Sequence, residues 1–163
     1  SEEIVLEKLK RQFIKNKDGS VIKSDSLYLK SSVFINNTAT YSLSKGLVMY
    51  KSSTTKLEVE NLTFINNVVS AGCIDVKKNK ATITDCTFIG NSISTSSNKG
   101  SAILIEDSCS VLIESSKFIN NKDMGKYSSV IYISSSLLSK DFFSVKVTCL
   151  FLFLILIKTL FLL

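Results

Sequence analysis

The stretch Leu57-Glu58-Val59-Glu60-Asn61-Leu62-Thr63-Phe64-Ile65-Asn66-Asn67 contains the pattern that decides the fold of this chain. Its closing phrase, Phe-Ile-Asn-Asn, has four relatives in the 163 residues, which begin at Phe13, Phe34, Phe88 and Phe118. Successive Phe residues lie 21, 30, 24 and 30 positions apart. A recurrence of about 20–50 residues predicts a solenoid or an array, in which each unit buries its apolar face against the next.

Each copy of the phrase closes a longer unit. In the four copies from Phe34 onward, the positions seven and five before Phe are apolar, and the residue between them is polar in two copies, at Glu58 and Thr82. This alternation is typical of a half-buried strand. The position three before Phe holds Asn, Asp or Ser, which tolerate bends because their side chains bond to nearby backbone. Each unit therefore predicts a strand, a bend, a short strand and a corner at Asn.

A second apolar segment separates the units. It reads Gly46-Leu47-Val48-Met49-Tyr50, Gly72-Cys73-Ile74-Asp75-Val76, Gly100-Ser101-Ala102-Ile103-Leu104-Ile105 and Ser129-Val130-Ile131-Tyr132-Ile133. A period this short leaves no room for helical crossovers, so each strand should pair in parallel with its own copies. The sequence predicts an all-β solenoid of about five to six coils. It should form one domain over residues 1–146, with residues 1–19 as a degenerate N-terminal coil or cap.

Stacked coils would place equivalent side chains above one another. We expect Phe34, Phe64, Phe88 and Phe118 to stack inside one corner, and Asn36, Asn66 and Asn120 to form a ladder of amides beside them, as repeated Asn does in stacked sheets. Residues 4–14 also allow a different interpretation, because Ile4 to Ile14 would pass as an amphipathic helix. The repeat phrase that closes this stretch favours a worn coil instead.

The alternation of Phe-x-x-Asn with a Gly-containing phrase resembles the repeats of polymorphic outer-membrane proteins. Gly100-Ser101-Ala102-Ile103 and Ala71-Gly72-Cys73-Ile74 are the nearest copies of the second phrase, whereas Gly46-Leu47-Val48 and Ser129-Val130-Ile131 depart from it. The resemblance covers about residues 20–134. It implies a right-handed parallel β-helix with an exported, surface-attached and adhesin-like role.

Composition weighs against several classes of function. The net charge is +6, but all but one of the 20 basic residues are Lys spread along the chain, and the exception is Arg11. Nucleic-acid binders concentrate Arg and Lys on one face, so no nucleic-acid partner is expected. Without His, and with Asp residues scattered rather than recurring, we expect no catalytic residues, no metal site and no cofactor.

The four Cys stand at 73, 86, 109 and 149 without a Cys-x-x-Cys pair. Cys73 aligns with Ala102 of the next copy and Cys86 with Leu62 of the preceding one, which predicts small buried side chains. A disulfide between neighbouring coils is the alternative in an exported protein.

The C-terminal segment 147–163 (VTCLFLFLILIKTLFLL) is almost wholly apolar. Three interpretations compete: a membrane-spanning helix at the short limit of length, a lipid-anchor signal after Ser134-Ser135-Ser136, and a last β-coil that covers the end of the solenoid. The first two make the membrane a partner of the chain through this tail.

The family resemblance, together with the apolar tail, implies a non-enzymatic surface or membrane-anchored protein with its repeat domain facing the exterior. The resemblance further implies that its partner would be a protein or glycan of a host or cell surface. Asn36 and Asn61 open glycosylation sequons at predicted corners. The alternative is a fragment of a carbohydrate-active β-helix, a polysaccharide lyase or hydrolase, which would need carboxylates clustered on one face.

Overall fold

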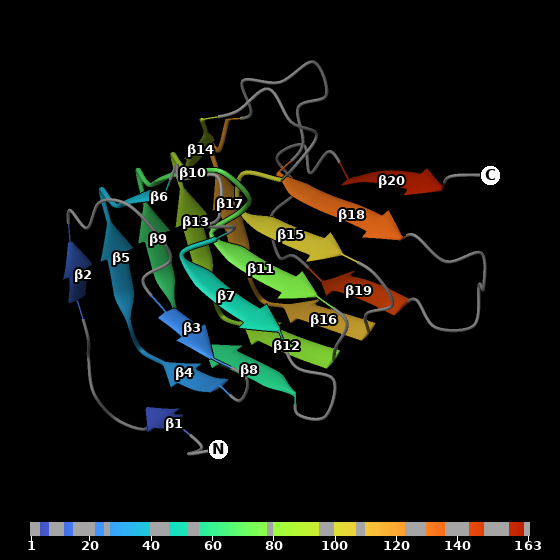
Figure 1. Ribbon diagram of the computed structural model, residues 1–163, viewed down its shortest axis with the longest axis horizontal. Helices are drawn as coiled ribbons and strands as arrows, with labels where there is room; N and C mark the ends of the chain where they lie inside the picture. The colour runs from blue at the N-terminus through green and yellow to red at the C-terminus, as the bar shows by residue number, and fades with distance from the viewer. Residues whose placement is uncertain are drawn as a thin grey trace.

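The computed structural model describes residues 4–6, 12–14, 22–24, 27–39, 46–51, 56–77, 80–94, 100–106, 110–122, 130–135, 144–148 and 157–161. These residues form an all-β protein of parallel strands in four stacked sheets, with no helix among them (Figure 1). The arrangement is consistent with a β-helix-like fold. The predicted all-β class and parallel pairing are therefore confirmed.

Two six-stranded sheets form the larger walls. Sheet A consists, in order, of β1 (Ile4–Leu6), β4 (Leu27–Lys30), β8 (Leu57–Glu60), β12 (Lys80–Thr84), β16 (Ser110–Glu114) and β19 (Ser144–Thr148). Sheet D consists, in order, of β3 (Ile22–Ser24), β7 (Val48–Lys51), β11 (Ile74–Lys77), β15 (Ile103–Glu106), β18 (Ile131–Ser135) and β20 (Ile157–Phe161). Figure 1 shows β7, β11, β15 and β18 side by side with their arrows in one direction.

Two smaller sheets complete the enclosure. Sheet B consists of β2 (Gln12–Ile14), β5 (Val33–Ile35), β9 (Thr63–Ile65), β13 (Thr87–Ile89) and β17 (Lys117–Ile119). Sheet C consists of β6 (Thr38–Ala39), β10 (Val68–Val69) and β14 (Ser92–Ile93), and Lys122 extends it by one bridge to Ser92. All neighbours are parallel and in register, so that Phe64 of β9 pairs with Phe34 on one side and Phe88 on the other.

The bends predicted before each Phe carry left-handed backbone. Ser31, Asn61, Asp85 and Ser115, which connect sheet A to sheet B, have φ values between 48° and 54°. Backbone hydrogen bonds continue through these bends, as from Asn61 N to Thr84 O at 3.0 Å. Asn, Asp and Ser bear this conformation better than branched residues do, and the chain therefore turns at the same place in each of these four copies.

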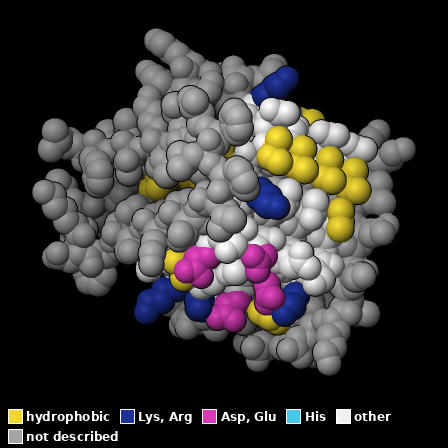
Figure 2. All heavy atoms as spheres, turned by 180° about the vertical axis from the view of Figure 1, so that it is seen from behind, with side chains coloured by type: hydrophobic (Ala, Val, Ile, Leu, Met, Phe, Trp, Pro, Cys, Tyr) yellow, Lys and Arg dark blue, Asp and Glu magenta, His cyan; other side chains and the backbone are white. Residues whose placement is uncertain are grey.

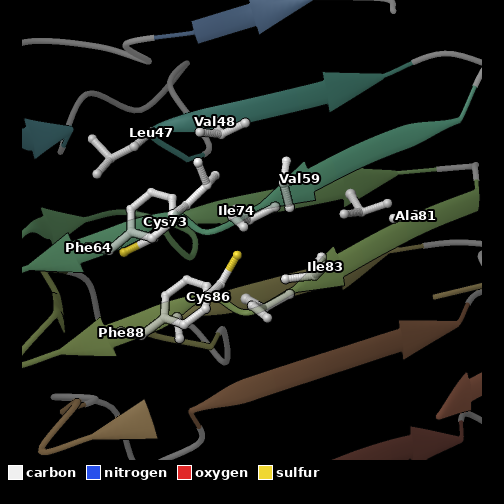
Figure 3. Close-up of a cluster of buried hydrophobic side chains, with 14 of the residues drawn as sticks. Leu47, Val48, Val59, Phe64, Cys73, Ile74, Ala81, Ile83, Cys86 and Phe88 are labelled. Atoms are coloured by element: carbon white, nitrogen blue, oxygen red, sulfur yellow. The ribbon is translucent and has the colours of Figure 1, made fainter. Parts of the chain in front are cut away.

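One core fills the space between the sheets. In β8, Leu57 and Val59 are buried while Glu58 is exposed, as the alternation predicted. Figure 3 shows side chains from several sheets, among them Phe64, Ile74 and Ile83, within the same interior cluster. Complete burial of an aliphatic or Phe side chain contributes about 1.5–3 kcal/mol, so the in-register rows of Leu, Ile, Val and Phe are the main source of stability.

Sheet D departs from the simple alternation, because three consecutive residues are buried in β11 and again in β15. The outward residues Leu104 and Tyr132 form a second buried cluster with Ala71. Asp75, which precedes Leu104 in the same outward row, is also only 1% exposed. The outer side of sheet D is therefore covered over β11, β15 and β18, and it does not present the open polar face expected of an outward row.

The structure bears on the alternatives left open at the two ends of the chain. Ile4–Leu6 and Gln12–Ile14 are strands, which agrees with the coil favoured for residues 4–14 and not with the alternative helix. In the tail, Ile157–Phe161 pairs with β18 from Ile131↔Ile157 to Ser135↔Phe161, and this part is a strand rather than a helix. The expected boundary at residue 146 falls inside β19, which pairs with β16 along its whole length. Residues 149–156 lie outside the described part of the chain.

Candidate functional site

The four Phe residues expected to stack lie in one column inside sheet B. Ring centroids are 4.6 Å apart between Phe34 and Phe64, 4.9 Å between Phe64 and Phe88, and 5.0 Å between Phe88 and Phe118. The first three rings are fully buried, and Phe118 is partly exposed at the end of the column. Figure 3 shows Phe64 and Phe88 above one another in the interior. The column holds the strands of sheet B in register, and its three buried rings are not accessible to a ligand.

The amide ladder lies one residue later than predicted. Asn36, Asn66 and Asn120 are exposed and have φ values of 51–54°, so they form the corner between sheets B and C. The ladder is made by Asn37, Asn67, Asn91 and Asn121. Within it, Nδ2 of Asn37 donates to Oδ1 of Asn67 at 2.9 Å, and Nδ2 of Asn67 donates to Oδ1 of Asn91 at 2.9 Å.

The reason for the shift is the left-handed corner. At the third position of the phrase the backbone adopts positive φ, which turns the side chains of Asn36, Asn66 and Asn120 outward, and Gly90 takes this position in the fourth phrase with a φ of 63°. The second Asn points inward, where its amide bonds both the next amide and a buried carbonyl, as Asn67 Nδ2 does with Phe34 O at 3.0 Å. The ladder is therefore structural, like the Phe column.

Both glycosylation candidates are accessible. Asn36 and Asn61 are exposed, and Asn61 Nδ2 lies 3.3 Å from Ser31 Oγ. Their sequon partners Thr38 and Thr63 are half-buried. The structure thus displays both amides on corners, where an attached sugar would point away from the sheets.

The two described thiols are buried and not joined to each other. Cys73 Sγ lies 3.5 Å from Ser101 O, and Cys86 Sγ lies 3.3 Å from Thr84 O. Burial raises the pKa of Cys73 well above its ordinary value and raises the pKa of Cys86 to about 12. Both thiols stay protonated at neutral pH and act as small core side chains, as predicted. Cys109 and Cys149 lie outside the described residues.

The outer face of sheet A is the surface on which charged side chains gather. Figure 2 shows carboxylates together on one side of the molecule, bordered by Lys side chains. Glu58 and Glu60 project outward from β8, Glu114 projects from β16, and Asp85 stands on the bend after β12. We call these residues, with Tyr28, Lys30, Thr82, Thr84 and Leu112, the sheet A face.

Two ion pairs lie on this face, one between neighbouring strands and one at the start of β8. Lys30 Nζ lies 2.9 Å from Glu60 Oε2, which also accepts a hydrogen bond from Tyr28 Oη at 3.4 Å. The hydrogen bond with Lys30 is the main cause that lowers the pKa of Glu60 and raises that of Lys30. Lys56 Nζ lies 2.9 Å from Glu58 Oε1. The carboxylate of Glu60 is therefore held ionised, which suits binding or base chemistry better than proton donation.

A shallow hollow lies along one edge of the sheet A face. It has a volume of about 270 Å³ and is lined by Lys56, Lys80, Ala81, Thr82, Ser110, Val111 and Leu112. Sequence reasoning missed it, because its lysines looked like ordinary solvated residues. The positions of the two lysines were the signal that could have indicated the hollow. Lys56 and Lys80 each stand immediately before the first inward residue of their strand, which is Leu57 or Ala81.

Sheet B presents a contrasting outer face. Ile35, Ile65, Ile89 and Ile119 pair in register and project outward, and Ile119 is 44% exposed. Figure 2 shows an apolar band of this kind on the surface, apart from the carboxylates. In the described part of the chain, no three His, Cys, Asp or Glu side chains are grouped so as to hold a metal ion.

Comparison with known proteins finds no match: no family model matches the chain, and neither a curated protein nor a solved structure matches it. Among the residues that the structure describes, no helix is long and apolar enough to cross a membrane.

Proposed function

We propose that this chain is a right-handed parallel β-helix of about five to six coils that acts as a non-catalytic, adhesin-like interaction module at a cell surface. The six strands of sheets A and D support this number of coils, one strand per sheet for each copy of the sequence unit. Right-handedness follows from the general rule that about 98% of crossovers between parallel strands have this hand. The resemblance to polymorphic outer-membrane protein repeats points to the same fold and to export.

The sheet A face is the observation that carries the functional part of the proposal. In-register pairing of β4, β8, β12 and β16 sets charged and hydroxyl side chains in rows about 4.8 Å apart. These rows of side chains are held rigidly, because each of the strands that carry them is hydrogen-bonded through its backbone to a neighbouring strand on both sides. Such a surface can bind a partner without the ordering cost that a mobile loop would add.

The mode of attachment to the surface is a separate part of the proposal. The pairing of β20 with β18 supports a folded end for Ile157–Phe161, in preference to an anchor that leaves the domain. Expression with an added signal peptide in a eukaryotic secretory system, followed by carbonate extraction and phospholipase treatment of membranes, tests this. Appearance in the medium supports the folded end, whereas retention after carbonate or release by phospholipase supports an anchor.

Adhesion is tested with beads that carry the purified full chain. We expect such beads to be retained on cell monolayers more than beads that carry an unrelated protein of equal net charge. Equal retention on every monolayer tried would overturn the adhesive role.

A carbohydrate-active enzyme is the second candidate, because of the carboxylates on sheet A. Glu60 and Glu114 occupy the same register position two strands apart, a backbone separation of about 9.6 Å. Inverting glycosidases place their two carboxyl groups about 6.5–9.5 Å apart. The lowered pKa of Glu60 suits the base of such a pair. Release of reducing ends from polysaccharides, lost in Glu60→Gln, would favour this candidate over the module.

A further inference from the structure

Four exposed Asn residues stand at the ends of sheet B strands in the part of the chain that the structure describes. Asn61 lies on the bend before β9, and Asn36, Asn66 and Asn120 lie on the corners after β5, β9 and β17, all with φ values of 51–54°. Only Asn36 and Asn61 have Thr two positions later, and the 163 residues contain no other Asn-x-Ser/Thr sequon. The four positions thus share a backbone conformation, and the hydroxyl distinguishes two of them.

In each sequon the first and third residues face outward, and the second faces the core. Asn61 is exposed and Thr63 is half-buried in an outward position of β9, whereas Leu62 between them is fully buried. The sequon at Asn36 has the same order, with Asn37 as its buried middle residue. A sugar on Nδ2 of either exposed Asn would therefore leave the core and the amide ladder in place.

The two sequons flank neighbouring strands of sheet B. β5 and β9 pair in register and lie side by side in Figure 1. Asn36 directly follows Ile35, the last residue of β5, and Asn61 stands two residues before Thr63, the first residue of β9. At about 3.3 Å per residue and about 4.8 Å between strands, every outward residue of the two strands lies within about 10 Å of an attachment point. The outward Ile35 and Ile65 are half-buried, so they leave apolar surface between the two sequons.

We propose that Asn36 and Asn61 both carry N-linked glycans and that these glycans cover Ile35 and Ile65. In the transfer, Nδ2 of the Asn attacks C1 of the first sugar of an oligosaccharide carried on a lipid diphosphate. The C1–N bond forms and the C1–O bond to the diphosphate breaks. The diphosphate leaves with the electron pair, and Nδ2 loses one proton. The contact of Asn61 Nδ2 with Ser31 Oγ, at 3.3 Å, is exposed, so modification breaks no buried hydrogen bond there.

Transfer should precede the closing of the coil. Asn61 N donates to Thr84 O and Thr63 N donates to Ser32 O, both at 3.0 Å, so the backbone of this sequon is bonded to both neighbouring coils. An enzyme that must hold the Asn amide and the Thr hydroxyl together needs that backbone unbonded. Exposure in the folded chain then decides whether the bulky glycan is tolerated, because it must remain at the surface.

The first test uses the full chain isolated from its source cells. Release of glycans by peptide N-glycosidase in heavy-oxygen water converts each modified Asn to a labelled Asp, which peptide mass spectrometry locates. We expect label at positions 36 and 61 and none at 66 or 120. Positions 36 and 61 without label would overturn the proposal.

Variants expressed in a eukaryotic secretory system separate the sequon from the corner. Thr38→Val and Thr63→Val each introduce the residue that a neighbouring copy holds in register, at Val68 and Val33, so the fold should be retained and each variant should lose one glycan. Val68→Thr completes the sequon at Asn66 and should add one glycan. Val33→Thr, the same change without an Asn two residues before it, should add none. Equal gel mobility of the Thr38→Val, Thr63→Val and unaltered chains would overturn the assignment.

The covering of sheet B has its own readout. Trimming the glycans to their first sugar should increase the fluorescence of an apolar dye that binds exposed aliphatic surface. Ile35→Thr combined with Ile65→Thr, which keeps β-branched residues in the strands, should abolish this increase. An unchanged dye signal after trimming of the unaltered chain would overturn the cover.

This inference rests on the export part of the proposed function, because the sugar donor belongs to the secretory route. A chain that reaches the cell surface or the medium with both Asn residues unmodified overturns the inference alone. A glycosylated chain whose beads are retained no better than control beads overturns the adhesive role and leaves the modification.

Discussion

Replacing Asn67 with Ala tests whether the amide ladder stabilises the fold. Asn67 Oδ1 accepts bonds from Asn37 N and Asn37 Nδ2, both at 2.9 Å, and Asn67 Nδ2 donates to Phe34 O at 3.0 Å. Asn91 Oδ1 keeps its bond from the backbone N of residue 67. Three buried groups therefore lose a bond, and at about 1–2 kcal/mol each the free energy of unfolding should fall by about 3–6 kcal/mol.

The matched control is Asn66→Gly, one residue earlier. Asn66 is exposed with a φ of 52°, and Gly90 holds the equivalent corner in the next copy. Glycine adopts this conformation without strain, so the unfolding free energy should change by less than about 1 kcal/mol.

Urea unfolding followed by circular dichroism measures both variants, and an unchanged slope shows that the same surface is exposed. Equal shifts for Asn67→Ala and Asn66→Gly would refute the reasoning, since the buried amide would then contribute no more than the exposed one. A third variant, Asn121→Ala, should fall between them, because this half-buried amide lies at the end of the ladder and water can replace its bonds.

Other positions give further expectations. Phe64→Ala should lower the unfolding free energy by about 3–5 kcal/mol. Phe118→Ala should lower it by about half as much, because Phe118 is partly exposed. Equal losses of unfolding free energy in urea would contradict the inference that burial in the Phe column sets what each ring contributes. The Cys86 thiol has its pKa raised from 9.0 to about 12, so the stability it contributes is complete below pH 9 and falls by about 1.4 kcal/mol per pH unit above it. Cys86→Ser should show a shallower alkaline decline, and an identical pH profile would argue against a buried thiol. At Gly100 an added Cβ would overlap Ile103 O and lie 2.6 Å from Tyr132 N. Gly100→Ala should therefore lower the midpoint of thermal unfolding by several degrees. An unchanged midpoint would mean that the strands separate more easily than we infer.

The walls of the fold were predictable because their signal is periodic. The alternation in Leu57–Glu60 and its copies shows which residues are inward, and the Asn, Asp or Ser three before Phe in the four later copies marks a bend that the structure places at positive φ. The amide ladder was misplaced by one residue. The sequence held the needed signal, since the fourth position of the phrase is Asn in all four later copies, whereas the third is Gly at Gly90.

Other features could not be predicted from one strand at a time. Leu112 and Asp75 both occupy outward positions, yet one is half-buried on the sheet A face and the other is 1% exposed in sheet D. What distinguishes them is that the outer side of sheet D is buried around Asp75, Leu104 and Tyr132, which no local pattern indicates. The hollow depends in the same way on how Lys56, Lys80 and Ser110 align across three strands.

The copies differ in length at selected corners only, and this has an evolutionary consequence. The segments Leu27 to Ala39, Leu57 to Val69 and Ala81 to Ile93 have equal lengths, whereas the connections that follow, residues 40–47, 70–73 and 94–102, contain eight, four and nine residues. Insertions and deletions at this corner leave the Phe column and the amides in register. A lineage can thus vary these connections in length and sequence while the frame that displays them remains constant. The same corner is the natural place to graft a foreign peptide.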